Sequence, residues 1–143
     1  MRCRNGRRFS TAFWNDRGIS GAWWNQPDPT LNGLLRAGVA HFWFVTIHPF
    51  DYGNGRIARA LTDMALAQSD GHQKRYYSLS TQIREDRLGY YEQLKESQHN
   101  DGNLTPWLLW FLQTFEKAMT RCEDILQTSL LRAAFWSSHK WST

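Results

Sequence analysis

The sequence has little cysteine and no long apolar run. Two cysteines, Cys3 and Cys122, occur among its 143 residues, which excludes a secreted module held by several disulfides and favours free thiols. No stretch of about 18 apolar residues is present, so we expect no membrane-spanning segment. Four arginines lie within residues 1–10 with no apolar stretch after them. We therefore expect no signal peptide and a cytoplasmic protein.

The amino-acid composition is typical of one globular domain. Hydrophobic residues make up 41% of the chain and charged residues 21%, and a chain of this length can bury a core without metal ions or disulfides. The net charge of +4 permits nucleic-acid binding. No recognition-helix or zinc-finger pattern accompanies that charge, so for this chain alone we disfavour nucleic acid as a partner.

Apolar residues recur at helical spacing through most of the chain, which predicts an all-α fold. The first two expected helices are 28–47, with Asp28 as N-cap, and 55–68. A third, capped by Ser78 or Ser80, runs to about residue 96, and a fourth, capped by Thr105, has apolar residues up to Leu126. Pro49 should end the first helix at His48. We expect a poorly ordered or atypical segment over 1–27, a core over 28–128 and a tail over 129–143.

Eight tryptophans and other aromatic residues are present. Trp107, Trp110 and Phe111 recur at helical spacing in the last predicted helix. Aromatic side chains bury the largest areas, so these three are expected in the core or at a dimer contact rather than around an adenine ring.

The segment 48–59 concentrates residues suited to phosphate chemistry. The Gly-Asn-Gly turn over 53–55 precedes a predicted helix, so its backbone N–H groups and the helix N-terminus can face an anion. Arg56 and Arg59 lie on one helical face and can reach back over that turn. His48, just before the loop, suits proton transfer near neutral pH. The candidate phosphate-binding residues are Gly53, Asn54, Gly55, Arg56 and Arg59.

This segment closely resembles the signature of the Fic (Fido-fold) family, His-Pro-Phe-x-Asp/Glu-Gly-Asn-Gly-Arg-x-x-Arg. Eight fixed positions agree: His48, Pro49, Phe50, Gly53, Asn54, Gly55, Arg56 and Arg59. The flanking residues 40–47 and 60–63 also resemble bacterial Fic proteins, and the resemblance covers about 23–136. It implies a single domain with the Fic/Fido helical fold.

The resemblance implies a nucleotidyltransferase, a protein adenylyltransferase that moves AMP from ATP to a Ser, Thr or Tyr hydroxyl of a target protein. His48 would be the general base, the turn 53–55 would surround the α- and β-phosphates, and Arg56 and Arg59 would contact the β- and γ-phosphates. Fic-like kinases have lysine at the position of Gly55, so glycine implies AMP transfer rather than phosphate transfer. ATP is the implied substrate and an unidentified protein its partner; a homodimer stays open.

Two features depart from the family pattern. Tyr52 occupies the position of the acid that normally holds Mg²⁺, and a neutral phenol is a poor ligand for that ion. The neighbouring Asp51 is then the candidate metal ligand. Residues 1–22 show no alternating pattern for the β-hairpin flap of the family. The chain is therefore expected to be an attenuated adenylyltransferase or, alternatively, a catalytically degenerate nucleotide-binding or interaction module.

Overall fold

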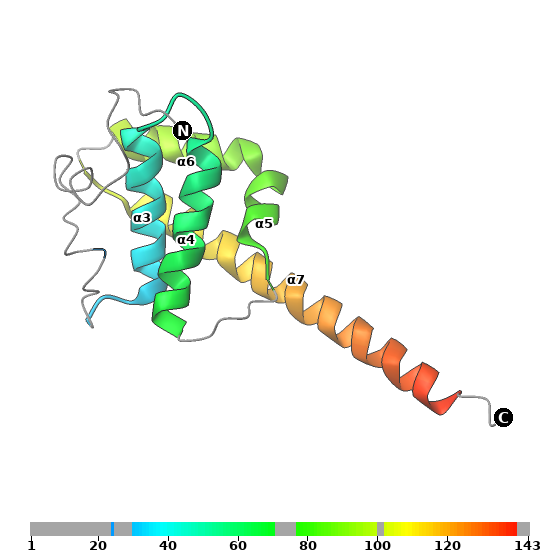
Figure 1. Ribbon diagram of the computed structural model, residues 1–143. Coiled ribbons are helices and arrows are strands. Elements are labelled where there is room, and N and C mark those ends of the chain that lie inside the picture. The colour runs from blue at the N-terminus through cyan, green and yellow to red at the C-terminus, as the bar shows by residue number, and fades with distance from the viewer. Residues whose placement is uncertain (1–23, 25–29, 71–76, 100–101, 140–143) are drawn as a thin grey trace.

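The computed structural model describes residues 24, 30–70, 77–99 and 102–139. Over these ranges it contains the helices α3 (Gly33–Ile47), α4 (Asn54–Asp70), α5 (Leu79–Glu85), α6 (Arg87–His99) and α7 (Thr105–Ser138) (Figure 1). The described ranges hold no strand, which confirms the all-α prediction. They also hold no helix of the length and apolarity that crossing a membrane requires. The expectations for the 1–22 segment and its flap lie outside the described residues.

Helices α3 and α4 lie side by side and present the loop between them at one end (Figure 1). The Oδ1 atom of Asn32 accepts a hydrogen bond from Leu34 N at 2.9 Å and caps α3. The helix therefore begins at Gly33, and the predicted start near residue 28 is wrong because Asn32 offers the effective cap. Its end at Ile47 is as predicted.

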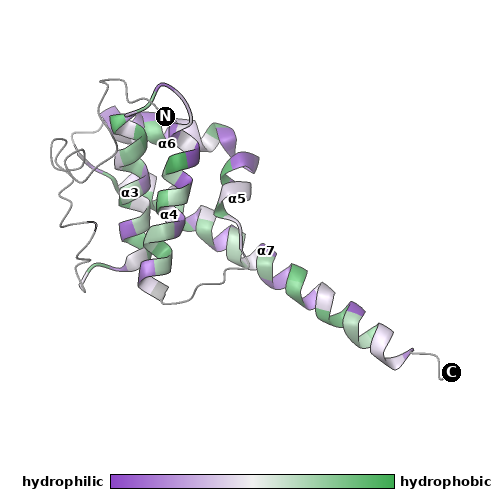
Figure 2. Ribbon diagram, viewed as in Figure 1, coloured by the Kyte–Doolittle hydropathy of each residue, from purple (hydrophilic) through white to green (hydrophobic). Residues whose placement is uncertain are grey.

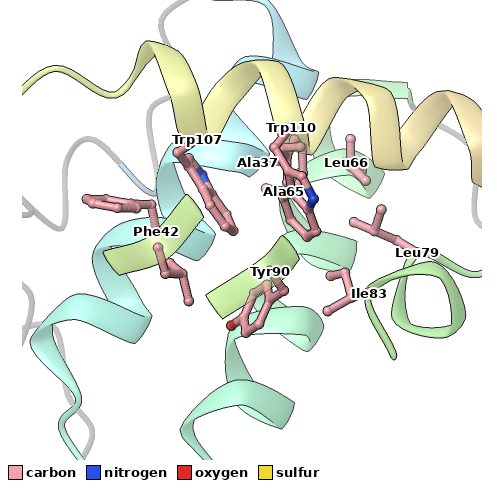
Figure 3. Close-up of a cluster of buried hydrophobic side chains, with 11 residues drawn as sticks. Ala37, Phe42, Ala65, Leu66, Leu79, Ile83, Tyr90, Trp107 and Trp110 are labelled. Atoms are coloured by element: carbon pink, nitrogen blue, oxygen red, sulfur yellow. The ribbon is translucent and has the colours of Figure 1, made fainter. Parts of the chain in front are cut away.

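The core forms where α7 crosses α3, α5 and α6. Trp107 and Trp110 of α7 pack with Tyr90 of α6, and all three are buried (Figure 3). The Trp107 indole N–H donates to the carbonyl of Gly38 at 2.9 Å. A Cβ atom at Gly38 would lie 3.0 Å from the Phe111 ring, so glycine permits the close approach of α3 and α7. The prediction that these aromatic residues are core residues is confirmed.

The third predicted helix is instead two helices, α5 and α6, separated at Asp86. The Asp86 carboxylate accepts hydrogen bonds from the Trp110 indole at 2.8 Å and from Gly89 N at 3.3 Å. The second bond caps the start of α6, since it satisfies a backbone N–H that has no partner in the first helical turn. The contact with α7 thus decides where the chain bends.

Helix α7 has 34 residues and extends well beyond the core, over a length of about 50 Å. Every residue from Glu123 to Ser138 is exposed, and Figure 1 shows this part projecting from the bundle. Figure 2 shows apolar and polar residues mixed along it. The helix continues past residue 128, where we expected the core to end. Thr105 is its first helical residue and not its cap, since the N-cap position is Leu104.

Candidate active site

His48 stands at the boundary between α3 and the loop. It adopts a left-handed backbone conformation, with φ 47° and ψ 58°, which ends the helix as Pro49 predicts. The side chain is exposed, and its Nδ1 atom lies 3.3 Å from the carbonyl oxygen of Val45. Because a carbonyl can only accept, Nδ1 is the donor in this contact, and in the neutral imidazole the lone pair is then on Nε2.

Asn54 supports the loop from the protein interior, and this residue is 3% exposed. Its Oδ1 accepts from Phe50 N at 3.0 Å, and its Nδ2 donates to Phe50 O at 2.6 Å. Both backbone groups of Phe50 are therefore satisfied by one side chain. The Phe50 ring packs against Phe44 of α3 in a second, smaller core cluster. The amide of Asn54 is thus a structural clamp, and only its backbone N–H is left to face a ligand.

The turn before α4 has the geometry of an anion site. Gly53 has φ 81°, a conformation that favours glycine. Its carbonyl accepts from Arg56 N and Ile57 N, both at 3.0 Å. Within the described residues no backbone carbonyl accepts from the N–H groups of Asn54 or Gly55. These donors stand at the N-terminus of a 17-residue helix, where partial positive charge collects.

The two arginines are placed differently. The Nη1 atom of Arg59 lies 3.6 Å from the position that a Cβ atom on Gly55 would occupy, so its guanidinium lies back over the first turn of α4, as the helical spacing predicts. Arg59 also lines a pocket between α4, α5 and α6. Arg56 is exposed and is not among the residues that line that pocket.

A chain of buried hydrogen bonds stands behind Arg59. The Thr62 hydroxyl donates to Ala58 O at 2.9 Å, so it accepts from His41 Nδ1, also at 2.9 Å. His41 Nε2 then accepts from the Tyr90 hydroxyl at 3.2 Å. Burial, followed by the charge of Arg59, lowers the pKa of His41 to about 3, and burial raises the pKa of Tyr90 to about 12. These side chains are neutral, and they join α3, α4 and α6 beneath the site.

The loop offers little to a metal ion. Asp51 and Tyr52 are both exposed, the latter to 82%. No group of three metal-ligating side chains occurs within the part of the chain that the structure describes. Mg²⁺ takes hard oxygen ligands, commonly one or two carboxylates together with phosphates. Asp51 is therefore the carboxylate of this loop that could contact a magnesium ion held by bound phosphates.

Comparisons with known proteins identify the class. Residues 13–66 match the sequence model of the Fic/DOC family. The chain is 31% identical to "Protein adenylyltransferase fic-1" of Caenorhabditis elegans over 100 aligned residues. The aligned region covers 70% of this chain and 18% of that protein. It is 30% identical over 98 residues to "Protein adenylyltransferase Fic" of Nematostella vectensis, covering 68% and 21%. The chain therefore belongs to the Fic/DOC family, and it spans about a fifth of the length of these curated relatives.

Sequence reasoning missed the residues around the pocket beside Arg59. Arg84, Arg87 and Tyr90 lie in the region expected to be one helix, to which we assigned no site. A signal was present, because Arg84 and Arg87 are three residues apart and share a helical spacing with Tyr91. The bend at Asp86 removes them from one continuous helix, and only the tertiary packing brings them next to Arg59.

Proposed function

We propose that this chain carries the transfer site of a protein adenylyltransferase, which moves AMP from ATP to a Ser, Thr or Tyr hydroxyl of a target protein. The printed names of the relatives support this activity. The positions of His48 before the loop, of the turn 53–55, and of Arg59 in α4 over Gly55 support it independently. Because the chain spans only about a fifth of those relatives, the activity and its protein target are part of this proposal.

The observation that carries the proposal is the geometry of His48. Its Nδ1 contacts Val45 O on an exposed ring, so in the neutral imidazole the lone pair of Nε2 faces outward beside the loop. This nitrogen accepts the proton of the target hydroxyl while the hydroxyl oxygen attacks the α-phosphorus of ATP. The bond from the α-phosphorus to the bridging oxygen breaks, and pyrophosphate leaves with that electron pair.

The residues after His48 supply electrostatic stabilisation. The backbone N–H groups of the turn 53–55 and the N-terminus of α4 face the α- and β-phosphates. Arg59 and, from its exposed position, Arg56 neutralise charge that grows on the pyrophosphate. Positioning and charge neutralisation account for most of the catalysis in phosphoryl-type transfer, so a rigid turn is central to the rate.

Tyr52 sets the limit on this activity. Its exposed phenol stands where the family has an acid, so Asp51 is the carboxylate of the loop that would hold the ion accompanying ATP. We therefore propose an attenuated transferase. The same observation favours a second function, a degenerate domain that binds nucleotide without transferring AMP.

Intact mass spectrometry after incubation with ATP and magnesium chloride tests the proposal. We expect the chain to gain one AMP by self-modification, and His48→Ala to reduce the gain by about 10²-fold or more because the general base is lost. His139→Ala is the matched control, since His139 is exposed at the far end of α7. No mass gain together with calorimetric binding of ATP would establish the second function. No binding of ATP would contradict both.

A further inference from the structure

The pocket beside Arg59 has a volume of about 370 Å³. Helix α4 contributes Arg59 to its wall, and the other lining residues come from α5 and α6: Ser80, Thr81, Ile83, Arg84, Arg87, Tyr90 and Tyr91. Three of these side chains are guanidinium groups and two are aliphatic hydroxyls, and none of the described lining residues is a carboxylate. Guanidinium groups bind phosphate oxygens with paired hydrogen bonds, so this lining favours an anion that carries phosphate.

The acids nearest in sequence to the arginines of α5 and α6 make their contacts elsewhere. Glu85 forms an ion pair with Arg121 of α7. The Asp86 carboxylate accepts hydrogen bonds from the Trp110 indole and from Gly89 N. Neither acid is among the residues that line the pocket. The packing of α7 thus engages both carboxylates outside the pocket.

The arginines of the pocket keep their charges. Arg59, Arg84 and Arg87 form no ion pair within the ranges that the structure describes. Arg87 lies over the Tyr91 ring, 5.6 Å from its centroid, a contact that holds the guanidinium without neutralising it. Like charges that share one pocket repel each other, and a bound anion with several negative charges removes that repulsion.

The direction of a bound nucleotide follows from the residue roles proposed above. The α-phosphate lies at the glycine turn beside His48, and the β- and γ-phosphates extend to Arg59. Because Arg59 lies over Gly55 and also lines the pocket, the pocket continues the phosphate chain at the end away from the ribose. Its volume falls within the range of small-ligand sites and exceeds what one terminal phosphate fills. A group that enters it past Arg59 is therefore attached beyond the γ-phosphate.

We infer that this pocket receives a fourth phosphate, so that the domain prefers a nucleoside 5′-polyphosphate longer than a triphosphate. The inference rests on the proposed function only in that the α-phosphate lies at the glycine turn and the chain extends to Arg59. Arg84 and Arg87 are the specificity-determining residues, because they stand where the added phosphate lies.

A longer phosphate chain leaves the transfer step itself unchanged. The target oxygen bonds to the α-phosphorus, and its proton passes to Nε2 of His48. The bond from the α-phosphorus to the bridging oxygen breaks, and tripolyphosphate leaves with that electron pair in place of pyrophosphate. Arg84 and Arg87 contact the far end of this leaving group and take no part in bond making or bond breaking.

Calorimetry with ATP and with adenosine 5′-tetraphosphate tests this inference, in one buffer of fixed ionic strength and magnesium chloride concentration. The two probes differ by one phosphate at the end of the chain. We expect the tetraphosphate to bind at least about tenfold more tightly, because guanidinium groups bind the added phosphate. In the double variant Arg84→Gln, Arg87→Gln the two probes should bind equally. Both side chains are exposed, so this variant should keep the fold.

The matched control is the double variant Lys117→Gln, Arg132→Gln. It removes the same number of positive charges from exposed positions of α7 outside the pocket, so the tetraphosphate should keep its advantage. Loss of the advantage in this control would assign it to net charge and overturn the site. Equal affinities of the two probes for the unaltered chain would overturn the inference, and so would an advantage that survives without Arg84 and Arg87.

Inorganic tripolyphosphate is the third probe. If it binds as tightly as adenosine 5′-tetraphosphate, the pocket takes free polyphosphate and the nucleotide assignment is wrong. The proposed function fails by a different result, since absence of ATP binding would contradict it. Equal binding of ATP and the tetraphosphate leaves the AMP mass gain as its own test and removes only the inference about the pocket.

Discussion

The loop between α3 and α4 has an inward and an outward side, and the two differ in burial and in bonding. On the inward side, Phe50 and Asn54 are buried and hydrogen-bonded to each other. On the outward side, His48, Asp51 and Tyr52 are exposed. The inward side holds the shape of the loop, and the outward side carries the groups that can react. Because the stabilising contacts lie on the inward side, a tyrosine at position 52 can replace an acid without harm to the fold.

The largest expected effect comes from breaking the inward side. Asn54→Ala removes both hydrogen bonds that the Asn54 side chain makes with the backbone of buried Phe50, which lowers the free energy of unfolding by roughly 1–3 kcal/mol. The glycine turn loses its support, so AMP transfer falls as well. Urea denaturation and the mass assay measure the two effects. The control on the outward side, Asp51→Asn, should change the free energy of unfolding by less than about 0.5 kcal/mol. If both variants lost a comparable free energy of unfolding, the two sides of the loop would not differ in their structural role.

A second effect follows from His41, which is buried between Thr62 and Tyr90. In the unfolded chain its pKa is near 6.5, whereas in the folded chain it is about 3. The unfolded state therefore binds more protons over that range, and the free energy of unfolding falls as the pH drops below 6.5, by about 1.4 kcal/mol per pH unit. This contribution is fully present above pH 6.5.

The variant His41→Gln isolates that contribution from other titrating groups. It cannot take up a proton in either state, so its free energy of unfolding should depend less steeply on pH between about 6 and 4 than that of the unaltered chain. Urea denaturation at several pH values gives both slopes. Identical slopes would show that His41 titrates in the folded chain as it does in the unfolded one.

The smallest change in stability, and the sharpest test of the outward side, is Tyr52→Asp. The exposed position predicts a change in the free energy of unfolding of less than about 0.5 kcal/mol. The added carboxylate supplies a hard oxygen ligand, so AMP transfer in magnesium chloride should rise about tenfold or more. Tyr52→Phe is the control and should leave transfer unchanged. An unaltered rate in Tyr52→Asp would remove the argument for attenuation.

Much of the fold could be predicted from local signals. Pro49 follows the left-handed residue that ends α3, and the glycine turn opens α4 close to the expected residue. The start of α3 was missed because the sequence prediction places the cap at Asp28, whereas the Asn32 side chain accepts from Leu34 N and Leu35 N. The break at Asp86 was missed because it depends on a hydrogen bond to Trp110, 24 residues further along the chain.

Local sequence was enough to set the helical class, the glycine turn and the order of reactive residues along the loop, because proline, glycine and helical spacing act over a few residues. Which charged groups have partners depends instead on how the helices pack. Glu85 and Asp86 turn to α7, so Arg84 and Arg87 lie beside Arg59 with no ion pair to any acid that the structure describes. Ion pairs and hydrogen bonds depend on distances between helices, and those distances are set by the packing of α7 across the bundle.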